Sequence, residues 1–202
     1  MVRFPVHWTE ARLGDLFEIQ QGKAVSKNGP QSGEDLPFLR TSNVLWNRLD
    51  LRALDHMRFS KSEAARLRLL PGDLLICEGG EIGRSAVWRG EVDLCCHQNH
   101  VHRLHPANGA VNSEFYALWM EAASLIFDVY RGQGNKTTIP NLSQARLAAF
   151  NVPLPPVEDQ RAIVRTLGAV QDAIAARRRE LELERERKAA LTEHLFTHRT
   201  RG

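Results

Sequence analysis

The sequence predicts an α+β domain of short strands with a few helices, followed by one long α-helix that could form a coiled coil. Two observations carry this prediction. Residues 1–152 mix short apolar runs with frequent glycine, proline and asparagine. After prolines 153, 155 and 156, the pattern becomes helical without interruption. Proline disfavours helix in the residue before it, so we place a boundary between a domain at 1–152 and an arm plus helix at 153–202.

The composition of the 202 residues, 43% apolar and 25% charged, is typical of soluble globular proteins. No apolar run reaches the roughly 18 residues of a membrane span, and the first residues lack the apolar core of a signal peptide. We therefore expect a cytoplasmic protein with no membrane partner. Three cysteines, two of them adjacent, argue against a disulfide framework. The net charge of +3 permits an acidic partner without requiring one.

Cap and breaker residues predict the helices of the domain. Thr9 can cap a short helix through Phe17. Ser60 and Glu63 have capping-box spacing, so we expect a helix to about Leu70, stopped by Pro71 and Gly72.

The rest of the domain predicts strands and then two more helices. Residues 72–80 and 84–90 read as two strands joined by a tight turn, and 94–104 as a third strand. Ser113 is predicted to cap an apolar helix that ends at Gly132, with Phe115, Trp119 and Ile126 in the core. Ser143 opens one more short helical turn.

One helix is predicted from Val157 to about Phe196, with acidic residues in its first turn. Arg177, Glu184 and Lys188 interrupt its apolar seam, and ten of the twelve residues from 177 to 188 are charged. Such a helix needs a partner to bury the seam, and dimerisation is our interpretation. A helix folded back on its own domain is the alternative. The seam, with spacings of three and four, consists of Ile163, Leu167, Val170, Ile174, Leu181, Leu191 and Leu195.

The sequence holds no set of residues that indicates catalysis, a cofactor or a metal site. RGQGNKTT at 131–138 has Asn135 and Tyr130 at the two positions where a phosphate-binding loop needs glycine, and it follows a predicted helix. EGGEIGRS at 78–85 favours a hairpin, because a strand and not a helix follows it. CCHQNHVHRLH at 95–105 would split its cysteines and histidines between two strand faces. A metalloenzyme built on this last stretch stays as an alternative.

Polar loops offer the side chains that read base edges, although such loops are more often only solvated. They concentrate at 40–48 and 132–141. For base contacts we nominate Arg40, Thr41, Asn43, Gln133, Asn135, Lys136 and Thr137, and for phosphate contacts Lys23 and Arg84.

Five segments in order resemble the specificity subunit of Type I restriction-modification systems. They are WTEARLGDLFEIQQGK, PFLRTSNV, LLPGDLLICEGGEIGRSAVW, CCHQNHVHRLHP and NKTTIPNLSQARLAAFNVPLPPVEDQRAIV, followed by the charged helix. The resemblance implies a non-catalytic subunit with a DNA target-recognition domain and a spacer helix. It also implies double-stranded DNA, a methyltransferase (M) subunit and, through the complex, a restriction (R) subunit as partners.

This chain carries one recognition domain and one helix, whereas the resemblance implies two of each in a usual specificity subunit. A second copy would supply the missing seam, so we expect a homodimer with antiparallel helices that reads two inverted half-sites. The alternative is a structural adaptor, or a truncated specificity subunit, that does not read DNA by itself.

Overall fold

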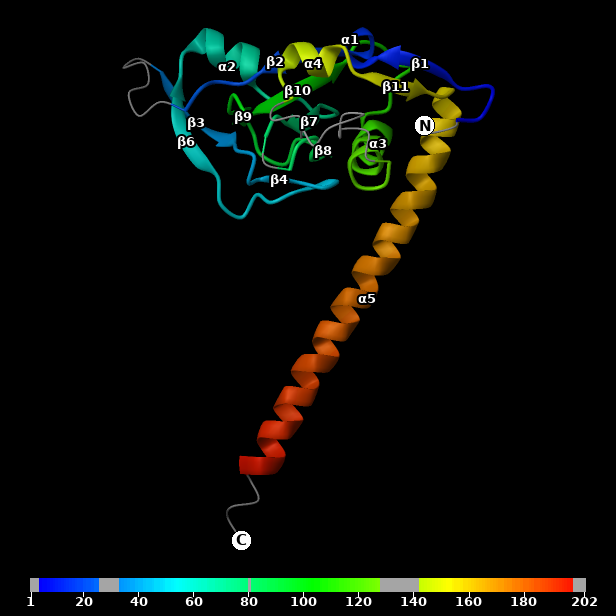
Figure 1. Cartoon of the computed structure of the whole chain (residues 1–202). Coiled ribbons are helices and arrows are strands. Elements are labelled where there is room, and N and C mark those ends of the chain that lie inside the picture. The colour runs from blue at the N-terminus through cyan, green and yellow to red at the C-terminus, as the bar shows by residue number, and fades with distance from the viewer. Residues whose placement is uncertain (1–3, 26–32, 80, 128–141, 198–202) are drawn as a thin grey trace, which may run out of the picture. The chain divides into compact units, whose positions relative to one another are not determined.

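The computed structural model describes residues 4–25, 33–79, 81–127 and 142–197. The chain divides into two compact units, Met1–Arg161 and Ala162–Gly202. The first contains strands and helices and the second continues one long helix (Figure 1). This confirms the predicted fold class of a mixed domain followed by a long C-terminal helix.

A four-stranded antiparallel sheet lies at the centre of the first unit, in the order β2-β10-β7-β8. Its strands are β2 (Phe17–Gln21), β10 (Val101–Pro106), β7 (Leu74–Cys77) and β8 (Ser85–Val87). The predicted pairing of 72–80 with 84–90 is confirmed, since Leu74 lies opposite Val87. β7 is buried along its whole length, so it forms the middle of the core together with the buried Trp88.

A three-stranded sheet of order β6-β3-β9 forms a second part of the core. It contains β3 (Glu34–Leu39), β6 (Asp55–Phe59) and β9 (Cys96–His97). The helix α2 (Lys61–Leu67) follows β6, and the predicted capping box is present, with Ser60 Oγ accepting from the Glu63 N–H at 3.2 Å. α2 ends three residues before the predicted Leu70, because the Leu69 N–H leaves the helix and donates to the Cys95 carbonyl at 2.8 Å.

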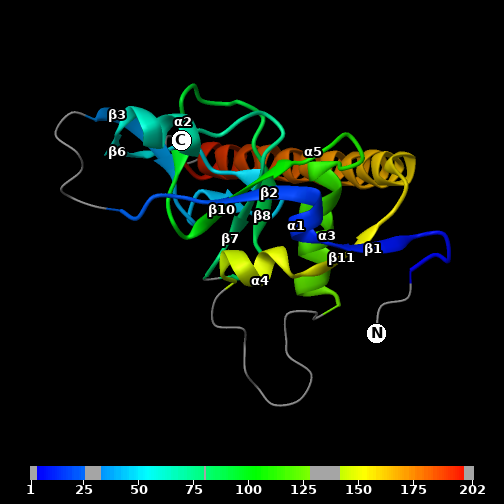
Figure 2. The ribbon, with the colours of Figure 1, turned by 90° about the horizontal axis from the view of Figure 1, so that it is seen from above.

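Long-range pairing overrides the predicted N-terminal helix. Thr9 begins the strand β1 (Thr9–Arg12), which pairs antiparallel with β11 (Asn151–Leu154). The Thr9 hydroxyl donates to the Leu154 carbonyl at 3.2 Å instead of capping a helix. Only the single turn α1 (Leu13–Leu16) remains helical, and α1 packs beside α4 (Gln144–Ala148), as Figure 2 shows from above. A two-residue pair, β4 (Val44–Leu45) with β5 (Arg48–Leu49), completes the strands described.

The predicted strand over 94–104 is two strands in two different sheets. The chain turns between β9 and β10, where the Val101 N–H donates to the Gln98 carbonyl at 3.0 Å. β9 pairs with β3, whereas β10 pairs with β2 and β7. Cys95, Cys96 and His97 are all buried, and the two adjacent cysteines pack into different clusters of the core, in keeping with side chains that alternate along a strand.

The helix α3 (Ser113–Leu125) packs against β8, but Asn112 caps it, not the predicted Ser113. Asn112 Oδ1 accepts from two N–H groups of the first turn, while the Ser113 hydroxyl donates to the Gly72 carbonyl at 2.6 Å. α3 ends at Leu125, before the predicted Gly132, which lies outside the described residues. Phe115 is buried and Trp119 is half-buried, but Ile126 is 72% exposed, so the prediction for Ile126 is wrong.

The predicted long helix is confirmed as α5 (Val157–Thr197), with Glu158 and Asp159 in its first turn. Gln160, which belongs to the first unit, is fully buried. Its side chain accepts from the Asn112 N–H at 2.9 Å and donates to the carbonyls of Ala110 and Pro155. The first turn of α5 is therefore fixed to the mixed domain by hydrogen bonds.

Candidate nucleic-acid interface

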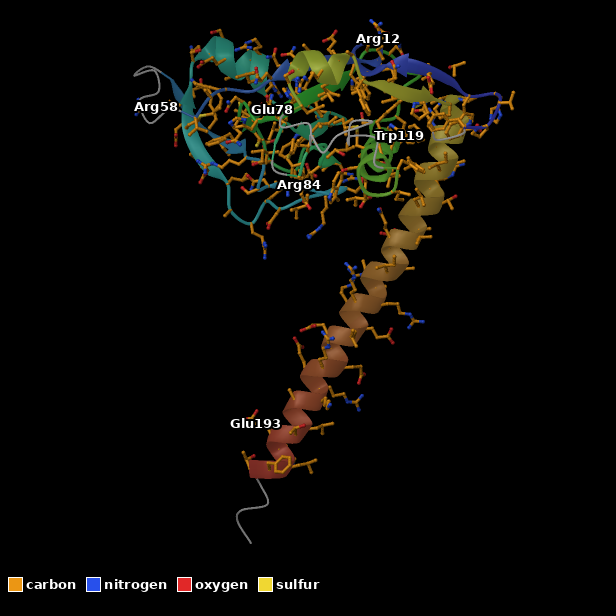
Figure 3. The ribbon with its side chains drawn as sticks, viewed as in Figure 1. Arg12, Arg58, Glu78, Arg84, Trp119 and Glu193 are labelled. Carbon is orange, nitrogen blue, oxygen red and sulfur yellow. The ribbon has the colours of Figure 1, made fainter. Side chains whose placement is uncertain are left out.

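The carboxyl end of β7 brings together segments that lie far apart in the sequence. We call this site the β7-end cluster, and define it as Thr41, Glu78, Arg84, His100 and Leu142. One guanidinium nitrogen of Arg84, Nη2, donates to the Thr41 carbonyl at 2.5 Å. The Glu78 N–H donates to the His100 carbonyl, and the Leu142 N–H donates to the Glu78 carbonyl, both at 2.9 Å. Glu78 and Arg84 are labelled in Figure 3.

Within the nominated loop at 40–48, Arg40 and Asn43 have opposite roles. Asn43 is 8% exposed, and its Oδ1 accepts from the Arg40 N–H at 2.8 Å. Its Nδ2 donates to the carbonyls of Asp50 and Ala53. With its amide used inside the protein, Asn43 shapes the loop.

Arg40, by contrast, is exposed at the surface of the mixed domain. Its Nε lies 2.5 Å from a carboxylate oxygen of Asp55, and its guanidinium lies over the Phe38 ring at 5.7 Å. An arginine held in this way keeps its outer nitrogens available to a second planar acceptor. Arg40 and the half-buried Thr41 are thus the nominated base-contact residues that the described loop presents outward.

The two nominated phosphate contacts, Arg84 and Lys23, are engaged inside the domain. The Arg84 side chain is 17% exposed and pairs with Glu81 at 3.1 Å. The Lys23 side chain is 14% exposed, and its Nζ lies 2.6 Å from a Glu63 carboxylate oxygen. This hydrogen bond from Lys23 lowers the pKa of Glu63. A phosphate would have to compete with these internal partners.

Gln133, Asn135, Lys136 and Thr137 lie outside the described residues. The next described residue after this loop is Leu142, a member of the β7-end cluster. The cluster therefore joins the nominated loop at 40–48 to the hairpin at 78–85, and it also includes Leu142, the first described residue after the nominated loop at 132–141.

Exposed cations on and beside α2 were not among the nominated residues. Lys61, Arg66 and Arg68 are all exposed, and Arg48 is exposed on β5. The run KSEAARLR is the signal in the sequence that marks the first three, since basic residues at the polar face of a helix are candidates for phosphate contact.

Of the cysteines and histidines at 95–105, four are buried in the core, namely Cys95, Cys96, His97 and His102. Burial raises the pKa of the Cys95 thiol to about 12 and that of Cys96 to about 11. Burial lowers the pKa of His97 to about 4, and that of His102 also falls. His97 lies between two carbonyls, with Nδ1 3.0 Å from the Leu67 oxygen. In the part of the chain that the structure describes, no three such residues are grouped so as to hold a metal ion.

The described residues include no helix that is long and apolar enough to cross a membrane.

Together, the fold and the cluster define a mixed α+β domain in which the loop at 40–48 meets the β7–β8 hairpin at one strand end, and whose chain continues into a long helix. Residues 5–185 match the model of the Type I restriction modification DNA specificity domain, and the chain belongs to this family. The match covers both the mixed domain and most of α5.

A curated relative is the putative type I restriction enzyme MjaX specificity subunit of Methanocaldococcus jannaschii, which is 24% identical. The match covers 96% of this chain and 46% of the relative. The chain thus spans about half the length of the curated relative that it matches.

Solved structures share the fold. A chain from a type I R-M system structure superposes with a TM-score of 0.67 at 23% identity, covering 95% of this chain and 46% of that one. The HsdS subunit of Thermoanaerobacter tengcongensis gives 0.60 at 22% identity, with 87% and 40% covered. The S subunit of M. genitalium gives 0.52 at 16% identity, with 88% and 42% covered.

Proposed function

We propose that this chain is a sequence-specific DNA-recognition subunit of a Type I restriction-modification complex. Residues 1–152 act as the target-recognition domain, and 153–202 act as the arm and spacer helix. The observation that carries this proposal is the family match over 5–185, which includes both parts. It is supported by the β7-end cluster, where Thr41 of the polar loop at 40–48 meets Arg84 of the hairpin.

In this proposal the chain recognises DNA, and its partners carry out the chemistry. A methyltransferase (M) subunit binds it directly, and a restriction (R) subunit joins through the complex, all in the cytoplasm. The buried thiols support a non-catalytic role, because a thiol with a raised pKa is a poor nucleophile at neutral pH.

Arg40 and Thr41 contact bases in this proposal, and Asn43 holds their loop in place. Further base contacts in this proposal come from Gln133, Asn135, Lys136 and Thr137. Arginine can form two hydrogen bonds to guanine, and each such pair contributes about 1–3 kcal/mol of discrimination. Exposed cations at Arg48, Lys61, Arg66 and Arg68 are added as phosphate contacts, because Lys23 and Arg84 have internal partners.

Two copies of the chain form a homodimer through α5 and read a bipartite site of two inverted half-sites. Six of the seven seam residues are 42–65% exposed, from Leu167 to Leu195. An apolar stripe of this kind gains stability by packing against a partner helix. A two-fold dimer of one recognition domain requires an inverted repeat, because the symmetry of the site follows that of the protein.

The decisive experiment selects bound sequences from a random DNA pool, with the methyltransferase subunit present. The wild-type chain should recover two inverted half-sites at a fixed gap. Arg40→Ala should relax one base position in each half-site and leave the gap unchanged. The matched control is Arg52→Ala, because Arg52 lies outside the loop at 40–48, pairs with Asp50 as Arg40 pairs with Asp55, and has a side chain that is 89% exposed.

Two results would contradict the proposal. If wild type recruits the methyltransferase subunit but selects no sequence, the chain is an adaptor. If Arg40→Ala and Arg52→Ala give the same sequence preference as wild type, Arg40 does not read a base.

A further inference from the structure

The seam of α5 follows a strict heptad pattern from Ile163 to Leu195. Spacings of four and three alternate without a break, as in the a and d positions of a coiled coil. Seven of these ten positions are apolar, and the other three are Arg177, Glu184 and Lys188. None of the ten is buried in the structure, so the whole seam is open to a partner.

The three charged seam residues discriminate between parallel and antiparallel pairing. In a parallel, in-register pair each seam residue faces its own copy. Arg177 would face Arg177, and Glu184 and Lys188 would likewise face their own copies, which places like charges together in three core layers. In an antiparallel pair these residues face other positions, and this conflict is removed.

We propose a specific antiparallel register, which rests on the proposed homodimer: Ile163 faces Leu195 of the second copy, and Leu167 faces Leu191. At both ends of the paired helices, apolar residues then face apolar residues. Toward the centre, Val170 faces Lys188, Ile174 faces Glu184, and Arg177 faces Leu181. All seven apolar seam residues lie within the paired region, and no core layer contains two like charges.

The registers one heptad away on either side are worse. A shift in one direction pairs Ile163 with Lys188 and leaves Leu191 and Leu195 beyond the paired seam. A shift in the other direction pairs Arg177 with Lys188, two cations in one layer, and moves the partners of Ile163 and Leu167 beyond α5. Each alternative exposes apolar side chains or places like charges together.

The charged centre stabilises the proposed register in a second way. Arg177 lies one layer from Glu184 of the second copy, about 4.5 Å along the axis, and one layer from the second Arg177, about 6 Å along it, so its nearer charged neighbour in the seam is the opposite charge. Arg177 also pairs with Glu180 of its own helix at 2.6 Å, so its charge is partly balanced before the helices meet. Polar residues at seam positions fix register and orientation while lowering stability. The charged centre is therefore a register device, and it determines how far apart the two first turns of α5 lie.

Disulfide crosslinking tests the register directly. Ile163 and Leu195 are about 48 Å apart along one helix, at 1.5 Å per residue, so a disulfide between them can form only between two chains. The double variant Ile163→Cys/Leu195→Cys should give mostly covalent dimer on a non-reducing gel after mild oxidation. Ile163→Cys/Lys188→Cys and Val170→Cys/Leu195→Cys report the two shifted registers and should give only traces. The native cysteines are buried and compete little.

A spin label at one exposed position avoids any change to the seam. With Asp172→Cys labelled, the two copies should lie about 21 Å apart along the coiled-coil axis. The shifted registers predict about 10 Å and about 32 Å, and parallel pairing predicts no axial offset.

The mass of the wild-type chain in solution separates the two levels of the proposal. A monomer overturns both the homodimer and the register. A dimer that crosslinks through either shifted pair, or that shows one of the other label separations, overturns the register and leaves the homodimer standing. A dimer with the 163–195 crosslink and the 21 Å separation supports both.

Discussion

The two units of this chain are held together by different kinds of interaction. In Met1–Arg161, contacts between distant segments dominate, as where β1 pairs with β11 and Thr9 lies opposite Leu154. In Ala162–Gly202, the hydrogen bonds and ion pairs span three or four residues, such as Thr166 to Ala162 and Arg177 to Glu180. No described residue after Arg161 is buried. The first unit is therefore stabilised by its own core, whereas the second buries no side chain of its own among the described residues.

The largest contrast between the units is expected from removing one large side chain from each. Trp88 is 1% exposed in the core, so Trp88→Ala should lower the free energy of unfolding by about 3–5 kcal/mol. Leu183 is 65% exposed and lies outside the seam, so Leu183→Ala should change it by less than about 0.5 kcal/mol. Denaturant unfolding measures both changes in the free energy of unfolding. It should be followed by far-UV circular dichroism, because the loss of Trp88 would alter a fluorescence signal. Equal effects would mean that α5 has its own buried contacts.

Acid should destabilise the mixed domain through His97. Burial holds the pKa of His97 at about 4 in the folded chain, compared with about 6.5 when unfolded. The unfolded state then binds the extra proton between these values, so stability is full above pH 6.5 and falls as the pH drops toward 4. The loss should be about 3 kcal/mol, measured as the free energy of unfolding at several pH values.

Replacing the buried histidine tests the origin of this pH dependence. His97→Asn should reduce the slope between pH 6.5 and 4, whatever its effect at neutral pH, and the part that comes from His102, whose pKa is also lowered by burial, should remain. The control is His56→Asn, because the His56 side chain is 52% exposed and its removal should leave the slope unchanged. An unchanged slope in His97→Asn would show that other groups cause the acid effect.

Features fixed by neighbouring residues could be predicted from the sequence. The capping box of Ser60 and Glu63 and the course of α5 depend on spacings of three and four residues, which the sequence displays. The predicted helix at Thr9 failed because its partner, Leu154, is 145 residues away. The strand over 94–104 failed for a similar reason, because β9 and β10 pair with different strands.

The candidate site shows the same limit. Residue type identified the loop at 40–48, and the structure joins it to the hairpin through Arg84. Residue type could not show that Lys23 and Arg84 are turned inward, because their partners Glu63 and Thr41 are 40 and 43 residues away. Asn43 is held by partners within ten residues, but their positions depend on the fold of the loop. Arg40 remains a candidate for base contact, since it is exposed although it pairs with Asp55.

Gln160 lies in the first turn of α5 and is buried in the core of the mixed domain. Of the changes predicted for Trp88, His97 and Gln160, its replacement should have the smallest effect on the free energy of unfolding. Its side chain accepts from the Asn112 N–H and donates to two carbonyls, so Gln160→Ala should leave buried groups unpaired and cost about 1–3 kcal/mol. Gln171→Ala is the matched control, because Gln171 is exposed on the same helix and outside the seam. Its cost should be below about 0.5 kcal/mol in denaturant unfolding. Similar costs for the two variants would mean that water replaces the Gln160 contacts, and that the first turn of α5 is not fixed to the domain by them.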